Sequence, residues 1–104
     1  MTLSGGSSSS SSGGTTSADV YLLARLIYGE GRGEPYEGQV AIGAVVLNRV
    51  KSSAFPNTIA GVIYQSGAFD AVSDGQINLA PDQTAIKAAR DALNGWDPTY
   101  GCLY

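Results

Sequence analysis

A glycine-rich segment, YGEGRGEPYEG at residues 28–38, divides the apolar part of the chain into two stretches with helical character. Its first three glycines each lower helix propensity by about 1 kcal/mol relative to alanine, and Pro35 is not tolerated inside a helix. The chain therefore has to change direction in this segment, which we call the elbow. Three of the nine acidic residues also lie in it: Glu30, Glu34 and Glu37.

The stretch before the elbow predicts a helix, because its apolar residues recur at i, i+3, i+4 and i+7. These residues are Val20, Leu23, Ala24 and Ile27. Ser17 or Asp19 can cap the start of this helix, and it should end near Glu30. A carboxylate gains nothing from the helix dipole at a C-terminus, so this position of Glu30 is costly unless the side chain has a function.

The stretch after the elbow contains the apolar run VAIGAVVL at residues 40–47, which fits either a buried strand or a buried helix. The segment from Pro35 to Lys51 is long for a strand and ends in polar and basic residues, which favours a central helix. Pro35 and the preceding Glu34 suit the first turn of that helix, where the dipole favours negative charge.

The rest of the chain predicts a short helix and a longer one, separated by a surface loop at residues 66–81. Asn57 or Thr58 can cap the short helix. The longer helix covers about residues 81–94, with one apolar face, and Gly95 follows it as a C-cap glycine. That apolar face consists of Ile86, Ala89 and Leu93. The fold class predicted is mainly α, a small helical domain with room for a short β segment.

The sequence contains no histidine, which excludes Ser-His-Asp and Cys-His catalysis and histidine-ligated metals. The net charge is -3 and the basic residues are scattered, so neither nucleic-acid binding nor a membrane-binding patch is indicated. No run of eighteen apolar residues exists, so no membrane insertion is expected. The aspartates at 70, 74 and 82 lack the spacing of a calcium loop. We expect no metal and no cofactor.

The first eighteen residues predict a flexible Ser/Gly-rich linker, because residues 4–14 contain only serine and glycine. Residues 19–104 form the domain. No basic region followed by an apolar run precedes the linker, so no signal peptide is recognised.

Because the sequence contains no histidine, an acid or base that acts near neutral pH must be a carboxylate, a lysine, a tyrosine or the lone thiol of Cys102. The glycosidic oxygen is a poor leaving group, and a carboxylic acid whose pKa is raised by burial can protonate it. Glu30, at the end of an apolar helix, is the leading candidate, and its flanking glycines would let a sugar approach the backbone. The alternative is an exposed glutamate at a helix end. Arg32 fits either contact with a carboxylate or an exposed position.

Other residues offer weaker indications. Asp70 and Asp74 could supply a second carboxylate, although a turn role is favoured for Asp74 before Gly75. Aromatic side chains that could stack on sugar rings, or belong to the core, are Tyr64, Phe69, Trp96 and Tyr104.

Four motifs occur in a fixed order: the GEGRGEP of the elbow, AVVLNRV, FPNT and GWDPT. With the sequence between them, from about residue 18 to residue 104, they resemble the SleB/CwlJ family of bacterial cell-wall hydrolases, which degrade spore-cortex peptidoglycan during germination. The resemblance implies a helical domain related to lysozyme-like lytic transglycosylases, with Glu30 as general acid and base. It implies action outside the cytoplasm, on cell wall or spore cortex.

The substrate expected from this resemblance is the MurNAc-GlcNAc backbone of peptidoglycan, cleaved by a glycosidase of lytic transglycosylase or muramidase type. We expect the loop from Phe69 to Gln76 to line the groove, with Phe69, Gln76 and Tyr104 contacting the glycan strand, and the protein to be a monomer. Family domains continue beyond Tyr104, so the domain is expected to lack its C-terminal part. The alternative function is an inactive domain that only binds peptidoglycan.

Overall fold

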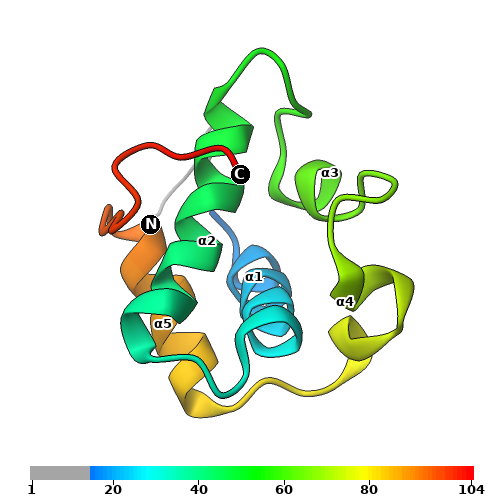
Figure 1. Cartoon of the computed structure of the whole chain (residues 1–104), viewed down its shortest axis with the longest axis vertical. Helices are drawn as coiled ribbons and strands as arrows, with labels where there is room; N and C mark the ends of the chain where they lie inside the picture. The colour runs from blue at the N-terminus through cyan, green and yellow to red at the C-terminus, as the bar shows by residue number, and fades with distance from the viewer. Residues whose placement is uncertain (1–14) are drawn as a thin grey trace.

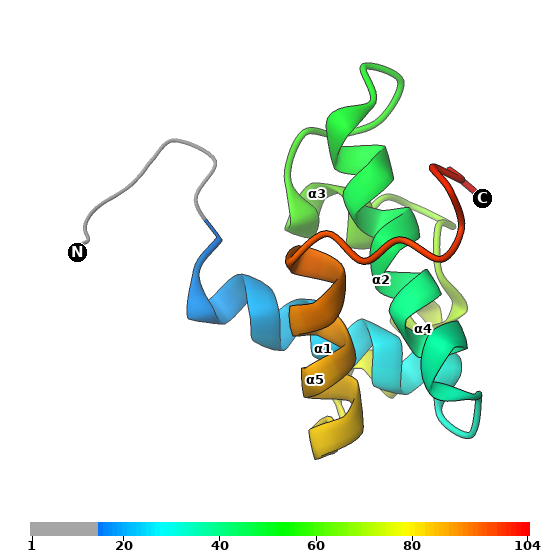
Figure 2. The same cartoon turned by 90° about the vertical axis from the view of Figure 1, so that its left-hand side faces the viewer.

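Three long helices form the centre of the structure: α1 (Ser17–Gly31), α2 (Tyr36–Lys51) and α5 (Gln83–Leu93). The structure is a computed structural model and describes residues 15–104. Helix α5 packs against both α1 and α2, and α1 also contacts α2 (Figures 1 and 2). Within the described range there is no strand, so the mainly α class is confirmed, whereas the strand alternative for residues 40–47 is wrong. No helix of this range is long and apolar enough to span a bilayer.

Short helices cover the other side of α1. They are α3 (Ile59–Ile63), α4 (Asp70–Ser73) and the 3-10 helix η1 (Gln76–Asn78). All three contact α1. The surface loop predicted at residues 66–81 therefore contains two short helices, which are too short to show a periodic pattern. The turn role predicted for Asp74 is confirmed, because its Oδ1 accepts a 3.0 Å hydrogen bond from the backbone N–H of Gln76.

The start of α1 is fixed by a capping box that involves Thr16 and Asp19. The Thr16 hydroxyl accepts a 3.1 Å hydrogen bond from the Asp19 N–H, and the Asp19 carboxylate accepts one of the same length from the Thr16 N–H. The cap predicted at Ser17 or Asp19 is therefore wrong, since Thr16 occupies that position. The helix starts two residues inside the predicted linker, and residues 1–14 of that linker lie outside the described part of the chain.

The elbow is a tight turn followed directly by α2. The Glu34 N–H donates a 2.9 Å hydrogen bond to the Gly31 carbonyl, Arg32 has φ -58° and ψ 125°, and Gly33 has φ +91°. This is the geometry of a type II turn, whose third position needs a positive φ and so favours glycine. Pro35 is the N-cap of α2 and Glu34 precedes it. The prediction placed both residues in the first turn of the helix, and it is wrong because they precede that turn by one and two positions.

Close helix packing explains the small residues of α2 and α5. A Cβ atom placed on Gly43 would lie 3.1 Å from the Ala92 Cβ and 3.1 Å from the Ile27 Cδ1, so Gly43 lets α2 approach both neighbouring helices. The buried residues of α5 are Ala85, Ala88, Ala89 and Ala92. Of the predicted apolar face, Ala89 is fully buried, whereas Ile86 and Leu93 are partly buried against the core, because alanines fit the closest part of this contact.

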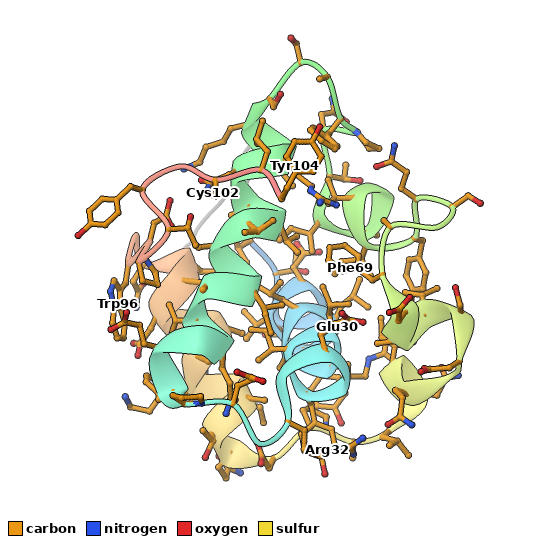
Figure 3. All side chains as sticks on the ribbon, in the orientation of Figure 1. Glu30, Arg32, Phe69, Trp96, Cys102 and Tyr104 are labelled. Atoms are coloured by element: carbon orange, nitrogen blue, oxygen red, sulfur yellow. The ribbon has the colours of Figure 1, made fainter. Side chains whose placement is uncertain are left out.

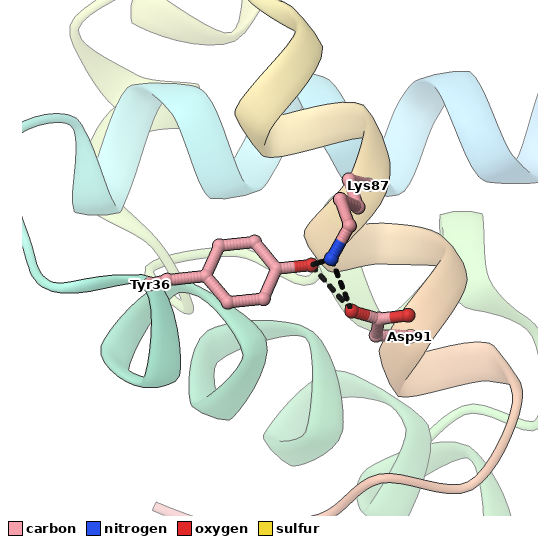
Figure 4. Close-up of polar contacts among 3 residues, drawn as sticks. All are labelled: Tyr36, Lys87 and Asp91. Atoms are coloured by element: carbon pink, nitrogen blue, oxygen red, sulfur yellow. Dashed lines mark hydrogen bonds and ion pairs between the residues drawn. The ribbon is translucent and has the colours of Figure 1, made fainter.

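A polar cluster on the surface joins the first turn of α2 to α5 (Figure 4). The Tyr36 hydroxyl donates a 2.5 Å hydrogen bond to the Asp91 carboxylate, and the Lys87 ammonium lies 3.4 Å from both groups. Burial raises the pKa of Tyr36, and its hydrogen bond to ionised Asp91 adds to this. The same hydrogen bond lowers the pKa of Asp91. The Trp96 ring packs against Tyr36 with its centroid 6.0 Å away.

Candidate active site

An open groove of about 430 Å³ runs along α2 and also receives residues from the end of α1, the elbow, the start of α4 and the C-terminal segment. It contains two of the three carboxylates of the elbow. The residues that line it are Glu30, Glu34, Gly38, Ala41, Ile42, Val45, Arg49, Phe69, Thr99 and Tyr104.

One face of α2 forms the long wall of the groove. Its groove residues, Gly38, Ala41, Ile42, Val45 and Arg49, recur at i, i+3, i+4, i+7 and i+11, which is the spacing of one helical face. The opposite face carries the buried core residues of this helix. Because one face lies in the core and the other forms an apolar wall, the run VAIGAVVL is apolar throughout.

Glu30 lies in the last turn of α1, at the rim of this groove. Its Oε2 accepts a 2.6 Å hydrogen bond from the Ala71 N–H of α4, while its Oε1 has no hydrogen-bond partner among residues 15–104. Figure 3 shows the Glu30 side chain beside Phe69, between α2 and α4. The expected burial of Glu30 is wrong: the residue is exposed, because its side chain lies at the open groove, whereas Gly31, the next residue of the same turn, is buried.

The glycines that flank Glu30 make room for protein, not for a sugar. A Cβ atom on Gly29 would lie 2.8 Å from the Ala71 Cβ, and one on Gly31 would lie 2.5 Å from the Ile42 Cδ1. The expectation that these glycines open space for a ligand is therefore wrong. Their absent side chains allow α4 and α2 to come close to the end of α1, which places the Ala71 N–H within reach of Glu30.

Glu34 lies in the same groove, although the sequence favoured a role only at the start of the next helix. Its side chain packs over Gly38, where an added Cβ atom would lie 3.5 Å from the Glu34 Cβ. The turn at Gly33 reverses the chain and brings Glu34 to the side where Glu30 already lies. Two carboxylates therefore share one groove, even though the helix between them is broken.

The predicted substrate contacts are only partly brought together. Phe69 and Tyr104 line the groove, whereas Gln76 does not. The side-chain oxygen Oε1 of Gln76 instead accepts a hydrogen bond from the Arg32 guanidinium. The central carbon of that guanidinium also lies 4.7 Å from the centroid of the Tyr28 ring. Arg32 thus contacts an amide rather than a carboxylate. The remaining aromatic candidates, Tyr64 and Trp96, are exposed and do not line the groove.

Asp97 holds the C-terminal segment against α2. Its carboxylate accepts hydrogen bonds from the Asn48 side chain at 3.0 Å, the Gly101 N–H at 2.8 Å, and the N–H and hydroxyl of Thr99 at 2.7 Å and 2.5 Å. The Thr99 hydroxyl, followed by the Asn48 amide, keeps the pKa of Asp97 well below its usual range. The segment crosses α2 in Figures 1 and 2, which brings Thr99 and Tyr104 to the groove.

We expect Asp97→Asn to lower the thermal midpoint, because an amide NH2 would face the donors of Asn48 and Gly101. A carboxylate with a depressed folded-state pKa adds stability that is fully present above its unfolded pKa, about 3.9, and lost as the pH falls toward the folded value. The difference in midpoint between wild type and variant should be largest near pH 7 and shrink below about pH 4. Circular dichroism melts from pH 3 to pH 7 measure it.

Asp74→Asn is the matched control for this comparison, since Asp74 accepts one hydrogen bond in a surface turn. Its effect on the midpoint should be smaller. A difference between wild type and Asp97→Asn that stays constant down to pH 3 would contradict the role assigned to the ionised carboxylate.

A second cavity, of about 460 Å³, lies on the other side of α2 and includes Asp19, Lys51 and Asp97. Both of its aspartates already accept hydrogen bonds from the protein. Neither Glu30 nor Glu34 lines it. Within residues 15–104, no three His, Cys, Asp or Glu side chains gather as metal ligands. The groove along α2 is therefore the better candidate for an active site.

Solved structures share this arrangement of helices. The catalytic domain of the Bacillus cereus SleB protein superposes with a TM-score of 0.84 at 58% sequence identity, covering 89% of this chain and 73% of that chain. The catalytic domain of the germination-specific lytic transglycosylase SleB from Bacillus anthracis gives 0.82 at 57% identity, covering 89% and 76%. The fold is thus that of a small, helical, lysozyme-like catalytic domain, as predicted.

The sequence comparisons lead to the same group of proteins. The family model described as Cell Wall Hydrolase matches residues 33–104. A spore cortex-lytic enzyme of Bacillus cereus is 62% identical over 86 residues, which cover 83% of this chain and 33% of that protein. The chain therefore spans about a third of the length of this curated relative. The chain belongs to the Cell Wall Hydrolase family, and the resemblance to the SleB/CwlJ group is confirmed.

Proposed function

We propose that this chain is the catalytic domain, residues 19–104, of a glycosidase that cleaves the MurNAc-GlcNAc backbone of peptidoglycan. The observation that carries the proposal is Glu30, a carboxyl group on the rim of an open groove with one oxygen held by the Ala71 N–H and the other without a protein partner. Membership of the Cell Wall Hydrolase family supports the substrate class. The domain acts as a monomer on glycan strands outside the cytoplasm, in cell wall or spore cortex.

Glu30 acts first as the acid and then as the base. Its proton passes to the glycosidic oxygen while the bond from that oxygen to C1 of the muramic residue breaks. The 6-hydroxyl of the same muramic residue then attacks C1, and its proton passes to the Glu30 carboxylate. The product carries a 1,6-anhydro ring, and Glu30 is protonated again. The hydrogen bond from Ala71 fixes the orientation of the carboxyl group, so that one oxygen is presented to the glycan.

The apolar wall of α2 and the ring of Phe69 suit the faces of sugar rings, which are apolar above and below the hydroxyl groups. A glycan strand lying on Ala41 and Val45 would exclude water from the rim where Glu30 lies. Excluding water favours the neutral form of a carboxyl group, which is the form that donates a proton. Tyr104 and Gln76 remain proposed as further contacts with the strand.

The test is to incubate the purified chain with insoluble sacculi and to identify the soluble products by mass spectrometry. We expect muropeptides that end in anhydro-muramic acid. Products with reducing ends, which are heavier by one water, would show that the bond is cleaved by hydrolysis and not by the proposed ring closure. Sedimentation of the protein with sacculi without soluble products would instead support a domain that only binds peptidoglycan. Neither binding nor release would overturn the proposed function.

A further inference from the structure

Arg49 is a buried cation on the groove wall that has no carboxylate partner. The residue as a whole is only 9% exposed, although it lines the groove. Among residues 15–104, the ion pair present is between Lys87 and Asp91, far along the sequence from Arg49. A charge buried to this degree is costly unless it is paired or otherwise compensated. A compensating environment must therefore exist for the guanidinium.

Aromatic rings provide part of that compensation. The central carbon of the guanidinium lies 5.1 Å from the ring centroid of Phe55, 5.2 Å from that of Phe69 and 5.5 Å from that of Tyr104. Cations near aromatic faces at these distances are stabilised by the electrostatic field of the ring. The three rings also keep the guanidinium in one place, since they come from separate segments of the chain.

The hydrogen-bonding capacity of Arg49 is mostly unused. Its Nε donates a 2.7 Å hydrogen bond to the Leu103 carbonyl. An arginine has five N–H donors, and within residues 15–104 the four on its two terminal nitrogens have no hydrogen-bond partner. A fixed guanidinium with free donors in a groove is the arrangement that binds carboxylates in a bidentate manner.

The groove is also electrically asymmetric along α2. Glu30 and Glu34 lie beside the start of this helix, whereas Arg49 lies eleven residues beyond Gly38, about 16 Å along the helix axis. The wall between these ends is apolar, formed by Ala41, Ile42 and Val45. A ligand that fills the groove therefore meets carboxyl groups at one end and a cation at the other, with an uncharged surface between them.

We propose that Arg49 binds a carboxylate carried by the glycan strand, namely a free carboxyl group of the amino acids that are attached through the lactyl group of a muramic residue. The inference rests on the proposed function, because it takes peptidoglycan as the ligand. Of the two alternating sugars in that polymer, only the muramic residue carries such an acidic substituent. Arg49 then restricts the register of the strand in the groove relative to Glu30.

Binding without turnover tests this role. Isothermal titration on the Glu30→Gln protein would compare muramic-acid-containing oligosaccharides whose lactyl group carries one alanine with a free carboxylate, the same compounds with that carboxylate amidated, and chitin oligosaccharides of equal length. We expect the free carboxylate to bind about tenfold more tightly than the amidated form. Adding Arg49→Gln should remove most of that preference, and Arg49→Lys should retain part of it, because it keeps the charge without the planar fork.

Arg90→Gln is the matched control, since Arg90 is exposed on α5 and does not line the groove. It should leave the tenfold preference intact. Equal affinity of the Glu30→Gln protein for free and amidated ligands would overturn the inference. So would an Arg49→Gln variant that loses affinity for all three ligands by the same factor, because Arg49 would then only hold the C-terminal segment in place. Circular dichroism establishes that each variant is folded.

These results are separable from the test of the proposed function. A chain that releases no muropeptides from sacculi, but still prefers the free carboxylate through Arg49, would overturn the enzymatic proposal and keep the assignment of Arg49. A chain that cleaves sacculi without that preference would keep the enzymatic proposal and overturn the assignment.

Discussion

Replacing Glu30 by glutamine should lower the rate of muropeptide release from sacculi by a factor of about 10² to 10⁴, the usual contribution of a general acid. Glutamine is nearly the same size, and its carbonyl oxygen can still accept the 2.6 Å hydrogen bond from the Ala71 N–H. The contact between α1 and α4 should therefore persist, and the helical circular dichroism should not change. The rate is measured as soluble muramic acid released from washed sacculi over time.

Glu37→Gln is the control for the Glu30 variant. Glu37 is exposed in the first turn of α2 and does not line the groove, so its loss should leave the rate near that of the wild type. Unchanged turnover in Glu30→Gln would reject this residue as the acid. A fall of similar size in Glu34→Gln would show that the second carboxylate of the groove takes part, which favours hydrolysis by two carboxyl groups over ring closure by one.

Adding one methyl group at Gly29 should destabilise the domain and also reduce activity. The new Cβ atom would lie 2.8 Å from the Ala71 Cβ and 3.3 Å from the Gln76 Cβ, so α4 would have to move away from α1. Overpacking of this kind costs about 1–3 kcal/mol, while replacing a helical glycine by alanine returns about 1 kcal/mol. The overpacking offsets or outweighs this gain, and chemical denaturation should show a net loss of up to about 2 kcal/mol in Gly29→Ala.

A double variant separates this clash from other effects. Ala71→Gly removes the methyl group that the new Cβ atom meets, so Gly29→Ala combined with Ala71→Gly should be more stable than the sum of the single changes predicts. A coupling free energy of about 0.5–3 kcal/mol is typical of residues in direct contact. The double variant should also regain part of the activity that Gly29→Ala loses, because α4 carries the N–H that is hydrogen-bonded to Glu30. Additive effects would mean that α4 does not limit the space at Gly29.

The central helices could be predicted from the sequence because each buries a long periodic face. The 3.6-residue period and the capping residues located α1 and α5 to within three residues at each end, and the length of the run after the elbow correctly favoured a helix for α2. Helices α4 and η1 could not be predicted in this way. They have four and three residues, too few for a period, and they form because they pack against α1.

The site was only partly predictable, for a related reason. Glu30 could be singled out because a carboxylate at a helix C-terminus is locally unfavourable, but nothing local shows that the Gly33 turn brings Glu34 to the same groove. Arg49 looked like an ordinary basic residue near a helix end. Its burial depends on Phe55, Phe69 and Tyr104, which come from distant segments. The sequence after the elbow contains a second apolar face of the α2 helix, which ends at Arg49. This second face is the feature of the sequence from which the groove could have been predicted.

The two faces of α2 have a consequence for how such a domain can diversify. Core packing depends on one side of the helix, including Val40 and Val46, which are fully buried, whereas the other side, including Ala41 and Val45, lines the groove. Replacements on the groove side remove few core contacts and so cost little stability compared with cavities in the core. Descendants of one ancestral domain can therefore change the lining of this groove through single, individually viable replacements along the helix, without first needing stabilising mutations elsewhere.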